Sequence, residues 1–408
     1  MTIAQGNIDV RPVDAASASI SADGQFVAFL SYARLASADT NNRADIYVLD
    51  RSIGSVTLET PGYAGSDSLT TPQLSGNGQL LVYEVSAASE RAGTGRHRTI
   101  MVRDRTLGIT RALLEGGDPA NGDSRDPRIA ADGRTVVFAS SSTNLVDSLD
   151  ANGIADDVFA ADLLTRGVRR LSVDSAGRQP AAGASFAPAA SQDARYVVFS
   201  STAPLDGSKR QTDEGRPRVE VYCRDTRLGV TTKISVAPGS GVADGSSYDV
   251  AISADGRFIA FVSEATNLAG RRDRNSAADI YLRDTVTGAI SLVSRSVKGD
   301  AGNGPSRHPA LSADGSVLVF QSDASDLTCG ARCREEDRDI NLVSDIFALD
   351  RLTGDIRRVS AGRTGWMEPS LGPVVDGAGA VVAFSSRRPR HGGDDRDDYD
   401  LFIRAPFK

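Results

Sequence analysis

The feature of this chain that most restricts its fold is a ten-residue segment that occurs seven times. The first copy spans residues 20–29, with the sequence ISADGQFVAF, and its tight turn contains Asp23 and Gly24. The other copies span residues 74–83, 129–138, 190–199, 252–261, 311–320 and 375–384. A self-similar unit that recurs at this spacing indicates a repeat architecture, in which each unit covers the hydrophobic face of the next.

A second element follows each copy of the first one. Its first example spans residues 45–50 (DIYVLD), and its counterparts begin at residues 99, 157, 220, 279, 345 and 400. In the first six copies a glycine turn and a short alternating segment come next. An Asp-Gly pair supplies the positive φ that a tight hairpin requires, and runs of Val, Ile and Phe favour buried strands. Each repeat is therefore predicted to contain four short strands.

Seven units of four strands predict an all-β chain folded as a seven-bladed β-propeller. A linear stack is disfavoured because it would need capping repeats at its ends. The seventh copy stops after its third strand, while an extra strand, residues 7–12, precedes the first copy. We therefore expect a single domain, residues 1–408, in which the N-terminal strand completes the last blade. The blades are expected at approximately residues 15–60, 69–115, 124–173, 185–236, 247–295, 306–360, and 370–408 together with 7–12.

The strand pair that begins with SADGRFIAFVS (residues 253–263), followed by DIYLRD (residues 279–284), resembles the WD40-like PD40 repeat of TolB-type β-propellers. The resemblance extends over nearly the whole chain and implies the propeller fold. Members of that family include periplasmic scaffold proteins, ligand-binding modules and propellers attached to some hydrolases. The resemblance therefore implies little about function. We expect no appended catalytic domain of the kind that the hydrolase members have.

Charge and composition exclude several classes of function. The formal net charge is −7, which argues against a nucleic-acid partner, because phosphate contacts need a basic surface. No apolar run approaches the length of about 20 residues that a membrane helix needs. Three His and three Cys in the whole chain argue against a zinc-ribbon type of metal centre. We find no nucleophile elbow and no phosphate-binding glycine loop, so no familiar catalytic motif is present.

The candidate binding residues lie where the inner strands begin. Strand order places the long connections and the blade linkers on one face, where binding residues concentrate in rigid scaffolds. The inner strands start on the same face and surround the central channel. Their first residues mix polar and aromatic side chains, which favours a concave ligand site: Arg125, Asp126, Tyr248, Asp249, Arg307, His308 and, in the seventh copy, Trp366. An alternative stays open, in which these residues only satisfy strand ends and line a water-filled channel.

The long connections contain a recurring Asp-x-Asn-x-x-x-Asp pattern. Clustered carboxylate and amide oxygens suit Ca²⁺, although the spacing is not that of an EF-hand. The alternative, which we favour, is that these side chains accept backbone hydrogen bonds and hold the loops in shape. The residues are Asp39, Asn41 and Asp45; Asp150, Asn152 and Asp156; Asp273, Asn275 and Asp279; and Asp339, Asn341 and Asp345, with a looser set at Asp394, Asp397 and Asp400.

The cysteines and the N-terminus bear on the cellular location. Cys329 and Cys333 lie in one long connection, where a local disulfide is the leading interpretation, and Cys223 is expected to be a buried, inert thiol. A disulfide favours an oxidising compartment. The first residues have no basic and apolar regions typical of a signal peptide. The resemblance and the loop cysteines favour a periplasmic or extracellular location. A cytoplasmic location is the alternative, and we expect a monomer.

Two functions from different classes follow from these observations. The first is a non-catalytic propeller that binds a protein or glycan partner on its long-loop face and at the channel mouth. The second is a hydrolase or lyase at the channel mouth, with His308, Asp249, Asp126 and either Arg125 or Arg307 as acid, base or electrostatic groups. A purely structural module of a larger assembly is a third alternative.

Overall fold

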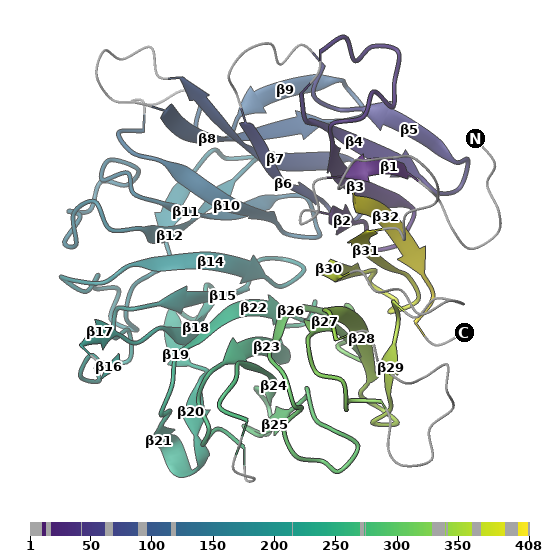
Figure 1. The fold of residues 1–408 in the computed structure, drawn as a ribbon. Helices are drawn as coiled ribbons and strands as arrows, with labels where there is room; N and C mark the ends of the chain where they lie inside the picture. The colour runs from purple at the N-terminus through teal and green to yellow at the C-terminus, as the bar shows by residue number, and fades with distance from the viewer. Residues whose placement is uncertain are drawn as a thin grey trace.

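The computed structural model describes residues 10–13, 18–41, 43–61, 68–88, 96–115, 120–213, 215–269, 273, 275–328, 339, 342–360, 369–387 and 399–406. These residues form seven four-stranded antiparallel sheets that surround a common axis (Figure 1). The predicted fold class, an all-β seven-bladed propeller, is confirmed. Within the described ranges no helix is both long and apolar enough to cross a membrane.

Each blade runs from its inner to its outer strand in chain order. Blade 1 contains β2 (Ala18–Ile20), β3 (Phe26–Ser31), β4 (Asp45–Asp50) and β5 (Ser55–Leu58). Blade 2 contains β6 (Ser68–Leu74), β7 (Leu80–Ala88), β8 (Arg96–Asp104) and β9 (Ile109–Ala112). Blade 3 contains β10 (Ser124–Ile129), β11 (Thr135–Ser140), β12 (Asp157–Asp162) and β13 (Val168–Arg170). Blade 4 contains β14 (Ser185–Ala190), β15 (Tyr196–Ser201), β18 (Glu220–Asp225) and β19 (Val230–Lys233). Blade 5 contains β22 (Ser247–Ile252), β23 (Phe258–Ser263), β24 (Asp279–Asp284) and β25 (Ile290–Leu292). Blade 6 contains β26 (Ser306–Leu311), β27 (Val317–Ser322), β28 (Asp345–Asp350) and β29 (Ile356–Arg358).

The seventh blade joins the two ends of the chain. It contains β30 (Ser370–Val375), β31 (Val382–Arg387) and β32 (Tyr399–Arg404), and its outer strand is β1 (Val10–Val13). Val10 pairs with Leu401 and Val13 pairs with Tyr399, so the purple β1 lies beside the yellow β32 in Figure 1. The closing strand is thus present, at residues 10–13. Residues 7–9 of the predicted closing strand lie outside the described residues.

A circle of backbone hydrogen bonds closes the ring a second time. The residue two positions after the end of each inner strand lies at the turn face, and backbone bonds of 2.8–3.0 Å link neighbouring blades there. The N–H of Ala22 donates to the Gly76 carbonyl, and the series ends when the N–H of Gly377 donates to the Ala22 carbonyl. The intermediate links run from Gly76 to Ala131, Asp132 to Gln192, Gln192 to Ala254, Ala254 to Ala313, and Ala313 to Gly377. Every blade is therefore fixed to both neighbours around the axis.

The repeated Ser-x-Asp-Gly sequence has a local explanation. In the first copy the Ser21 hydroxyl donates to Asp23 (2.5 Å) and accepts from the N–H of Phe26 (2.9 Å), while Gly24 has a φ of +71°. This conformation is unfavourable for residues with a Cβ atom. The same bonds recur around Ser253 and Ser312. The sequence motif is therefore the turn between the first and second strands.

The core lies between the second and third strands of successive blades. An aromatic pair stacks across these strands in six blades, with ring centroids 5.6–6.4 Å apart. Phe320 and Phe347 are an example, and both are fully buried. Stacked rings add to the free energy gained from apolar burial. The repeated Phe and Tyr residues of the sequence are therefore buried in the core.

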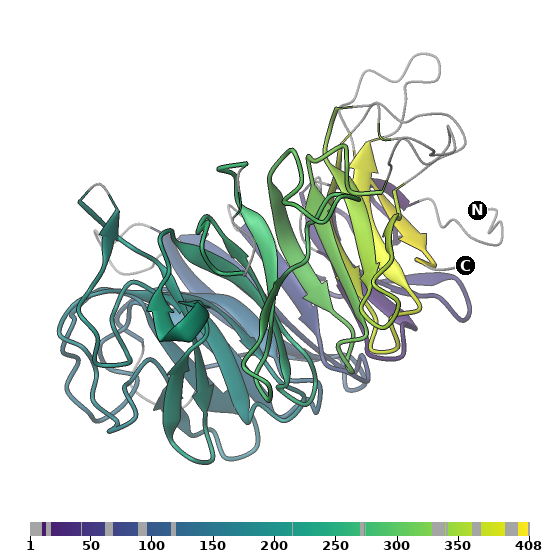
Figure 2. The same ribbon diagram turned by 90° about the horizontal axis from the view of Figure 1, so that it is seen from below.

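Strand pairing places the long connections and the blade linkers on one face, opposite the tight turns. The fourth blade departs from the predicted plan because its connections contain two extra hairpins. These are β16 (Thr212–Asp213) with β17 (Arg216–Pro217), and β20 (Val236–Ala237) with β21 (Gly241–Val242). The β16–β17 hairpin projects away from the stacked sheets at the upper left of Figure 2.

Candidate functional site

The inner strands share a bulge near their start on the long-loop face. Pairing between the first two strands shifts register between Arg125 and Arg128, and the same irregularity occurs in the other inner strands of blades 2 and 4–7. In five blades the bulge residue has a positive φ of 49–58°: Asp126, Ala187, Asp249, His308 and Gly372. Four of the five are not glycine, and this backbone conformation is strained for them. Strained backbone of this kind often accompanies functional sites.

The bulge brings Asp249 and His308 together. Asp249 Oδ2 accepts a hydrogen bond from the backbone N–H of His308 at 2.8 Å, and His308 Nδ1 lies 3.2 Å from the same oxygen. The two residues come from the inner strands of neighbouring blades. A carboxylate that accepts from Nδ1–H fixes the imidazole and leaves Nε2 to accept a proton. The structure thus places two of the predicted channel-mouth residues in direct contact.

A cavity of about 400 Å³ occupies the channel from this couple to the circle of backbone bonds at the turn face. Its wall consists mostly of small and aliphatic side chains, such as Ala18, Ala251 and Ile252. Among the residues that line it, the charged or titratable ones are Arg128, Asp249 and His308. A cavity in which a few polar side chains converge is a common form of small-molecule site.

Arg128 is a site residue that sequence reasoning missed. It precedes the last residue of β10, and the corresponding positions of the other blades carry small or uncharged side chains: Ser19, Gln73, Ala189, Ala251, Ala310 and Val374. Burial lowers the pKa of the Arg128 guanidinium, and Asp126 and Asp249 oppose the shift. Its Nη1 donates to the Pro127 carbonyl at 3.1 Å. In the described part of the chain it forms no ion pair with a carboxylate.

Other predicted mouth residues are engaged elsewhere and do not line the cavity. Arg125 pairs with Asp156 at 2.8 Å, and burial raises the pKa of that carboxyl. The Tyr248 hydroxyl donates to Glu264 at 3.0 Å, and burial with this carboxylate raises the pKa of Tyr248 to about 12. Arg307 pairs with Asp323 at 2.8 Å. Trp366 lies outside the described residues.

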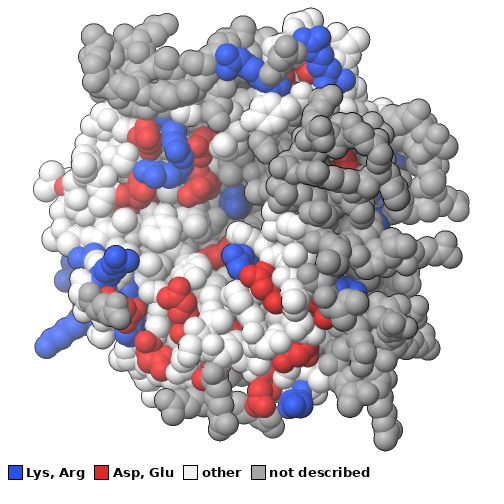
Figure 3. Space-filling model, in the orientation of Figure 1, with Lys and Arg blue, Asp and Glu red and all other residues white. Residues whose placement is uncertain are grey.

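Acidic and basic side chains alternate on the face viewed in Figure 3. Red and blue groups lie side by side there, and the described part of this face shows no broad field of a single sign. The ion pairs at the strand starts include Arg125 with Asp156 and Arg307 with Asp323. Mixed charges of this kind favour recognition of individual polar groups over attraction of a polyanion.

The Asp and Asn residues of the long connections form hydrogen-bonded networks at the outer strands. In blade 1 the Thr60 hydroxyl donates to Asp45 (2.7 Å), Asn41 Nδ2 donates to Asp45 (3.0 Å), and the Tyr47 hydroxyl donates to Asp39 (2.6 Å). In blade 6 Arg358 lies 3.4 Å from Asp339 and 3.3 Å from Asp345. Asn341, Asp394 and Asp397 lie outside the described residues, and Asp400 is on β32. These bonds agree with the hydrogen-bonding interpretation of the Asp and Asn pattern.

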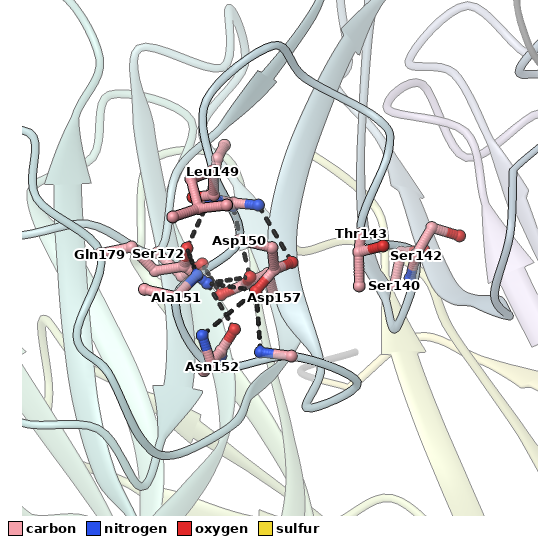
Figure 4. A network of polar contacts seen from close by, with 12 residues as sticks. Ser140, Ser142, Thr143, Leu149, Asp150, Ala151, Asn152, Asp157, Ser172 and Gln179 are labelled. Atoms are coloured by element: carbon pink, nitrogen blue, oxygen red, sulfur yellow. Dashed lines mark hydrogen bonds and ion pairs between the residues drawn. The ribbon is translucent and has the colours of Figure 1, made fainter.

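Blade 3 has the most extensive network, shown in Figure 4. Arg170 lies 3.1 Å from Asp150 and 3.3 Å from Asp157, and Gln179 Nε2 donates to Asp157 at 2.6 Å. Asn152 N donates to Asp150 at 3.2 Å. The third carboxylate of this blade is therefore Asp157, at the first position of β12, while the predicted Asp156 pairs with Arg125.

Blade 5 has two buried carboxylates with no such arginine partner among the described residues. Asp273 is 4% exposed and Asp279 is fully buried. Leu292 replaces the arginine of blades 3 and 6, and the Tyr281 hydroxyl donates to the Ala265 carbonyl. Asp273 Oδ2 is consequently buried with no hydrogen-bond partner. Burial, with the neighbouring Asp273 adding to the effect, raises the pKa of Asp279 to about 7.

We expect this pair to make stability depend on pH. Because the folded pKa of Asp279 is raised above its ordinary value of 3.8, its contribution is fully present at low pH and is lost as pH rises toward 7. The Asp279→Asn variant should reduce the fall in unfolding free energy between pH 5 and 7, by up to about 1.4 kcal/mol per pH unit. Urea titrations at several pH values measure this slope.

A matched control is Asp284→Asn, since its pKa is lowered to about 2 by the Arg257 hydrogen bond and lies outside this range. Its slope should equal that of the unmodified protein. An unchanged slope in Asp279→Asn would contradict the assignment of the proton to this pair.

The described residues do not form a site for a bound metal. They contain no group of three or more His, Cys, Asp or Glu placed to hold a metal ion. The calcium hypothesis for the loops stays a prediction. Cys223 is buried and unpaired, and burial raises its pKa to about 12. Cys329 and Cys333 lie outside the described residues, so their predicted disulfide also stays a prediction.

Comparisons with known proteins identify the fold. No family model and no curated protein matches the chain. An oligogalacturonate lyase from Vibrio parahaemolyticus matches 97% of this chain and 90% of its own, with 14% identity and a TM-score of 0.57. An oligogalacturonate lyase in complex with manganese matches 99% and 98%, with 15% identity and a TM-score of 0.57. The β-propeller domain of the Trilobed protease from Pyrococcus furiosus matches 98% and 95%, with 13% identity and a TM-score of 0.56.

At these identities the similarity defines the class of protein, a β-propeller, and no particular activity. The TolB-type family stays a resemblance, because no family model matches. The Pyrococcus furiosus domain is described as having an open velcro topology, whereas here β1 pairs with β32. The manganese is named for that lyase alone.

Proposed function

We propose that this protein is a binding propeller that takes a small hydroxylated acid, such as a sugar acid, at the mouth of its central channel. The observation that carries the proposal is Arg128. It is a guanidinium on the wall of the channel cavity, without an ion pair in the described part of the chain. A guanidinium matches the geometry of a carboxylate and binds it with two parallel hydrogen bonds.

The other groups at the cavity suit the remainder of such a ligand. Asp249 lines the cavity, so its carboxylate can accept a hydrogen bond from a ligand hydroxyl. The alanine and isoleucine wall suits the apolar face of a sugar ring. A cavity of about 400 Å³ falls in the ordinary range for small ligands.

The proposal extends to the long-loop face. We infer that the connections around the mouth contact a protein or a larger glycan, and that the protein acts in the periplasm or outside the cell. The strained bulges support a binding role for this face, since strain is retained where it positions functional groups.

The test is calorimetric titration with galacturonate and, as the uncharged counterpart, galactose. We expect galacturonate to bind and Arg128→Gln to weaken it at least about tenfold, because one charge-assisted contact is worth about 1.5–3 kcal/mol. Galactose binding should not change in this variant. The control is Arg134→Gln, which removes an exposed arginine paired with Asp162 away from the channel. Galacturonate affinity that is equal in the Arg128 variant and the unmodified protein would overturn the proposal.

A second candidate function is a lyase or hydrolase at the same mouth. The contact between His308 and Asp249 favours it, since this couple could act as a general base. The test is incubation with oligogalacturonides, followed by chromatography of the products. Turnover that disappears in His308→Gln would favour the enzyme, and the absence of turnover in the unmodified protein would remove this candidate.

A further inference from the structure

A second cavity, of about 430 Å³, lies between blades 4 and 5 and outside the channel. Its lining includes Leu228, Val230, Ile234 and Val286. Leu228, Val230 and Val286 are 68%, 43% and 74% exposed, so they form an apolar surface open to solvent. The ring of Tyr196 lines the same cavity.

At this place blade 5 lacks an arginine that blades 2 and 6 have. In blade 2 Arg105 covers the Phe26 ring at 4.9 Å and donates to the Gly78 carbonyl at 2.6 Å. In blade 6 Arg351 covers the Phe258 ring at 3.9 Å and donates to the Gly315 carbonyl at 2.8 Å. The corresponding residue of blade 5 is Thr285, which is too short to cover the Tyr196 ring.

The same place also lacks a carboxylate. In blade 2 Arg103 donates to Glu59 of blade 1 at 2.9 Å. The counterpart of Arg103 in blade 5 is Arg283, and the counterpart of Glu59 in blade 4 is the buried Ile234. Arg283 Nε is buried with no hydrogen-bond partner. Burial lowers the pKa of Arg283, and no carboxylate opposes the shift. A cation is thus left at the end of an apolar cavity.

The other charged groups of this cavity have partners of their own. Asp225 pairs with Arg195 at 3.0 Å, and Arg257 pairs with Asp284 at 2.9 Å. Asp255 accepts from the Ser253 hydroxyl at 2.6 Å and from the N–H of Arg257 at 2.9 Å. Arg283 is therefore the lining charge that a ligand can neutralise.

We propose that this cavity binds a small amphipathic carboxylate, of the type of a medium-chain fatty acid. The ligand carboxylate accepts a hydrogen bond from Arg283, as the Glu59 carboxylate accepts one from Arg103. The alkyl chain covers Ile234, Val230 and Leu228 and the part of Tyr196 that lines the cavity; Arg195 also lies over the Tyr196 ring, at 4.7 Å. Apolar burial and a charge-assisted hydrogen bond then act on one ligand. The site is separate from the channel, so it does not depend on the proposed function.

The experiment is calorimetric titration of the full chain with octanoate, and with octanol and octylamine as probes of equal chain length. We expect octanoate to bind at least about tenfold more tightly than either of the others, since the carboxylate contributes a charge-assisted bond. Arg283→Leu should abolish this preference while leaving octanol unchanged or tighter. Val230→Asp, at an exposed position, should weaken octanoate by repulsion without disturbing the core.

The control variant is Arg224→Leu. Arg224 is the counterpart of Arg283 in blade 4, and it bonds the Asp174 carbonyl and the Thr231 hydroxyl, both at 2.9 Å, outside this cavity. Octanoate affinity should not change in it. Equal affinity for octanoate and octanol, or octanoate binding that survives in Arg283→Leu, would overturn the proposal. Circular dichroism of each variant establishes that a loss of binding is not a loss of fold.

Discussion

Replacing Arg170 by leucine should lower the free energy of unfolding by about 3–5 kcal/mol at pH 8, the usual cost of removing one partner from a buried ion pair. The Arg170 side chain is 5% exposed, and it contacts Asp150 and Asp157, whose side chains are 6% and 3% exposed. The substitution leaves both carboxylates buried without a cation. Urea denaturation measures the loss, and Arg169→Leu, at an exposed neighbouring position, is the control.

The loss should be smaller at pH 5 than at pH 8. Burial raises the pKa of Asp157 to about 6 even beside Arg170. Below this pKa a proton replaces the missing cation, so the penalty for a buried charge falls with pH. A loss that is equal at both pH values would contradict the role assigned to the two carboxylates.

A second substitution should restore part of the lost stability. Blade 1 has Tyr47 and Leu58 at the positions of Phe159 and Arg170. There the Tyr47 hydroxyl, in place of an arginine, donates to the buried carboxylate of Asp39 at 2.6 Å. Combining Phe159→Tyr with Arg170→Leu should therefore recover about 1 kcal/mol or more relative to Arg170→Leu alone. Failure to recover any stability would show that the two blades are not interchangeable at this position.

Gly256→Ala should cost about 3 kcal/mol. Gly256 has a φ of +77°, and an added Cβ would lie 2.2 Å from the Tyr196 ring. Left-handed backbone costs about 1 kcal/mol for alanine, and forced overpacking adds about 1–3 kcal/mol. Gly108→Ala is the control, because Gly108 has a φ of +69° with no atom within 4 Å of the added Cβ. Its loss should be about 1 kcal/mol, and equal losses in both variants would exclude packing against Tyr196 as the cause.

The fold could be predicted from the sequence because its local signals agree with one another. The turn sequence, the buried runs and the third-strand element recur in register, and each corresponds to one observed structure, such as the turn at Ser21–Gly24. The hairpins β16–β17 and β20–β21 could not be predicted in the same way. They are two residues per strand and have no alternation of apolar and polar residues.

The candidate site could be predicted only in part. The strand starts suggested Asp249 and His308, and these two residues meet at the bulge. Arg125 and Arg307 lie one residue earlier and pair with Asp156 and Asp323 instead. A one-residue offset in an extended strand reverses the direction of a side chain. The register of the bulge, which decides this offset, is not visible in the sequence.

Two further residues show where a comparison among the repeats adds information. Arg128 resembles an ordinary polar strand residue until it is aligned with the small residues of the other blades. Asp157 follows Asp156 directly, so the spacing pattern alone did not distinguish them. The structure gives Asp157 the first position of β12, as Asp45, Asp279 and Asp345 are first in their strands.

The pairing of β1 with β32 has a consequence for the order of the blades along the polypeptide. These strands occupy the positions of β4 and β5 in blade 1, so the two described strand ends, Arg404 and Val10, stand where other blades have a hairpin turn. The circle of backbone bonds does not pass through this point. A covalent turn here, with the chain opened at Gly54 or Gly288, would give a circular permutant with the same seven sheets in a new sequence order.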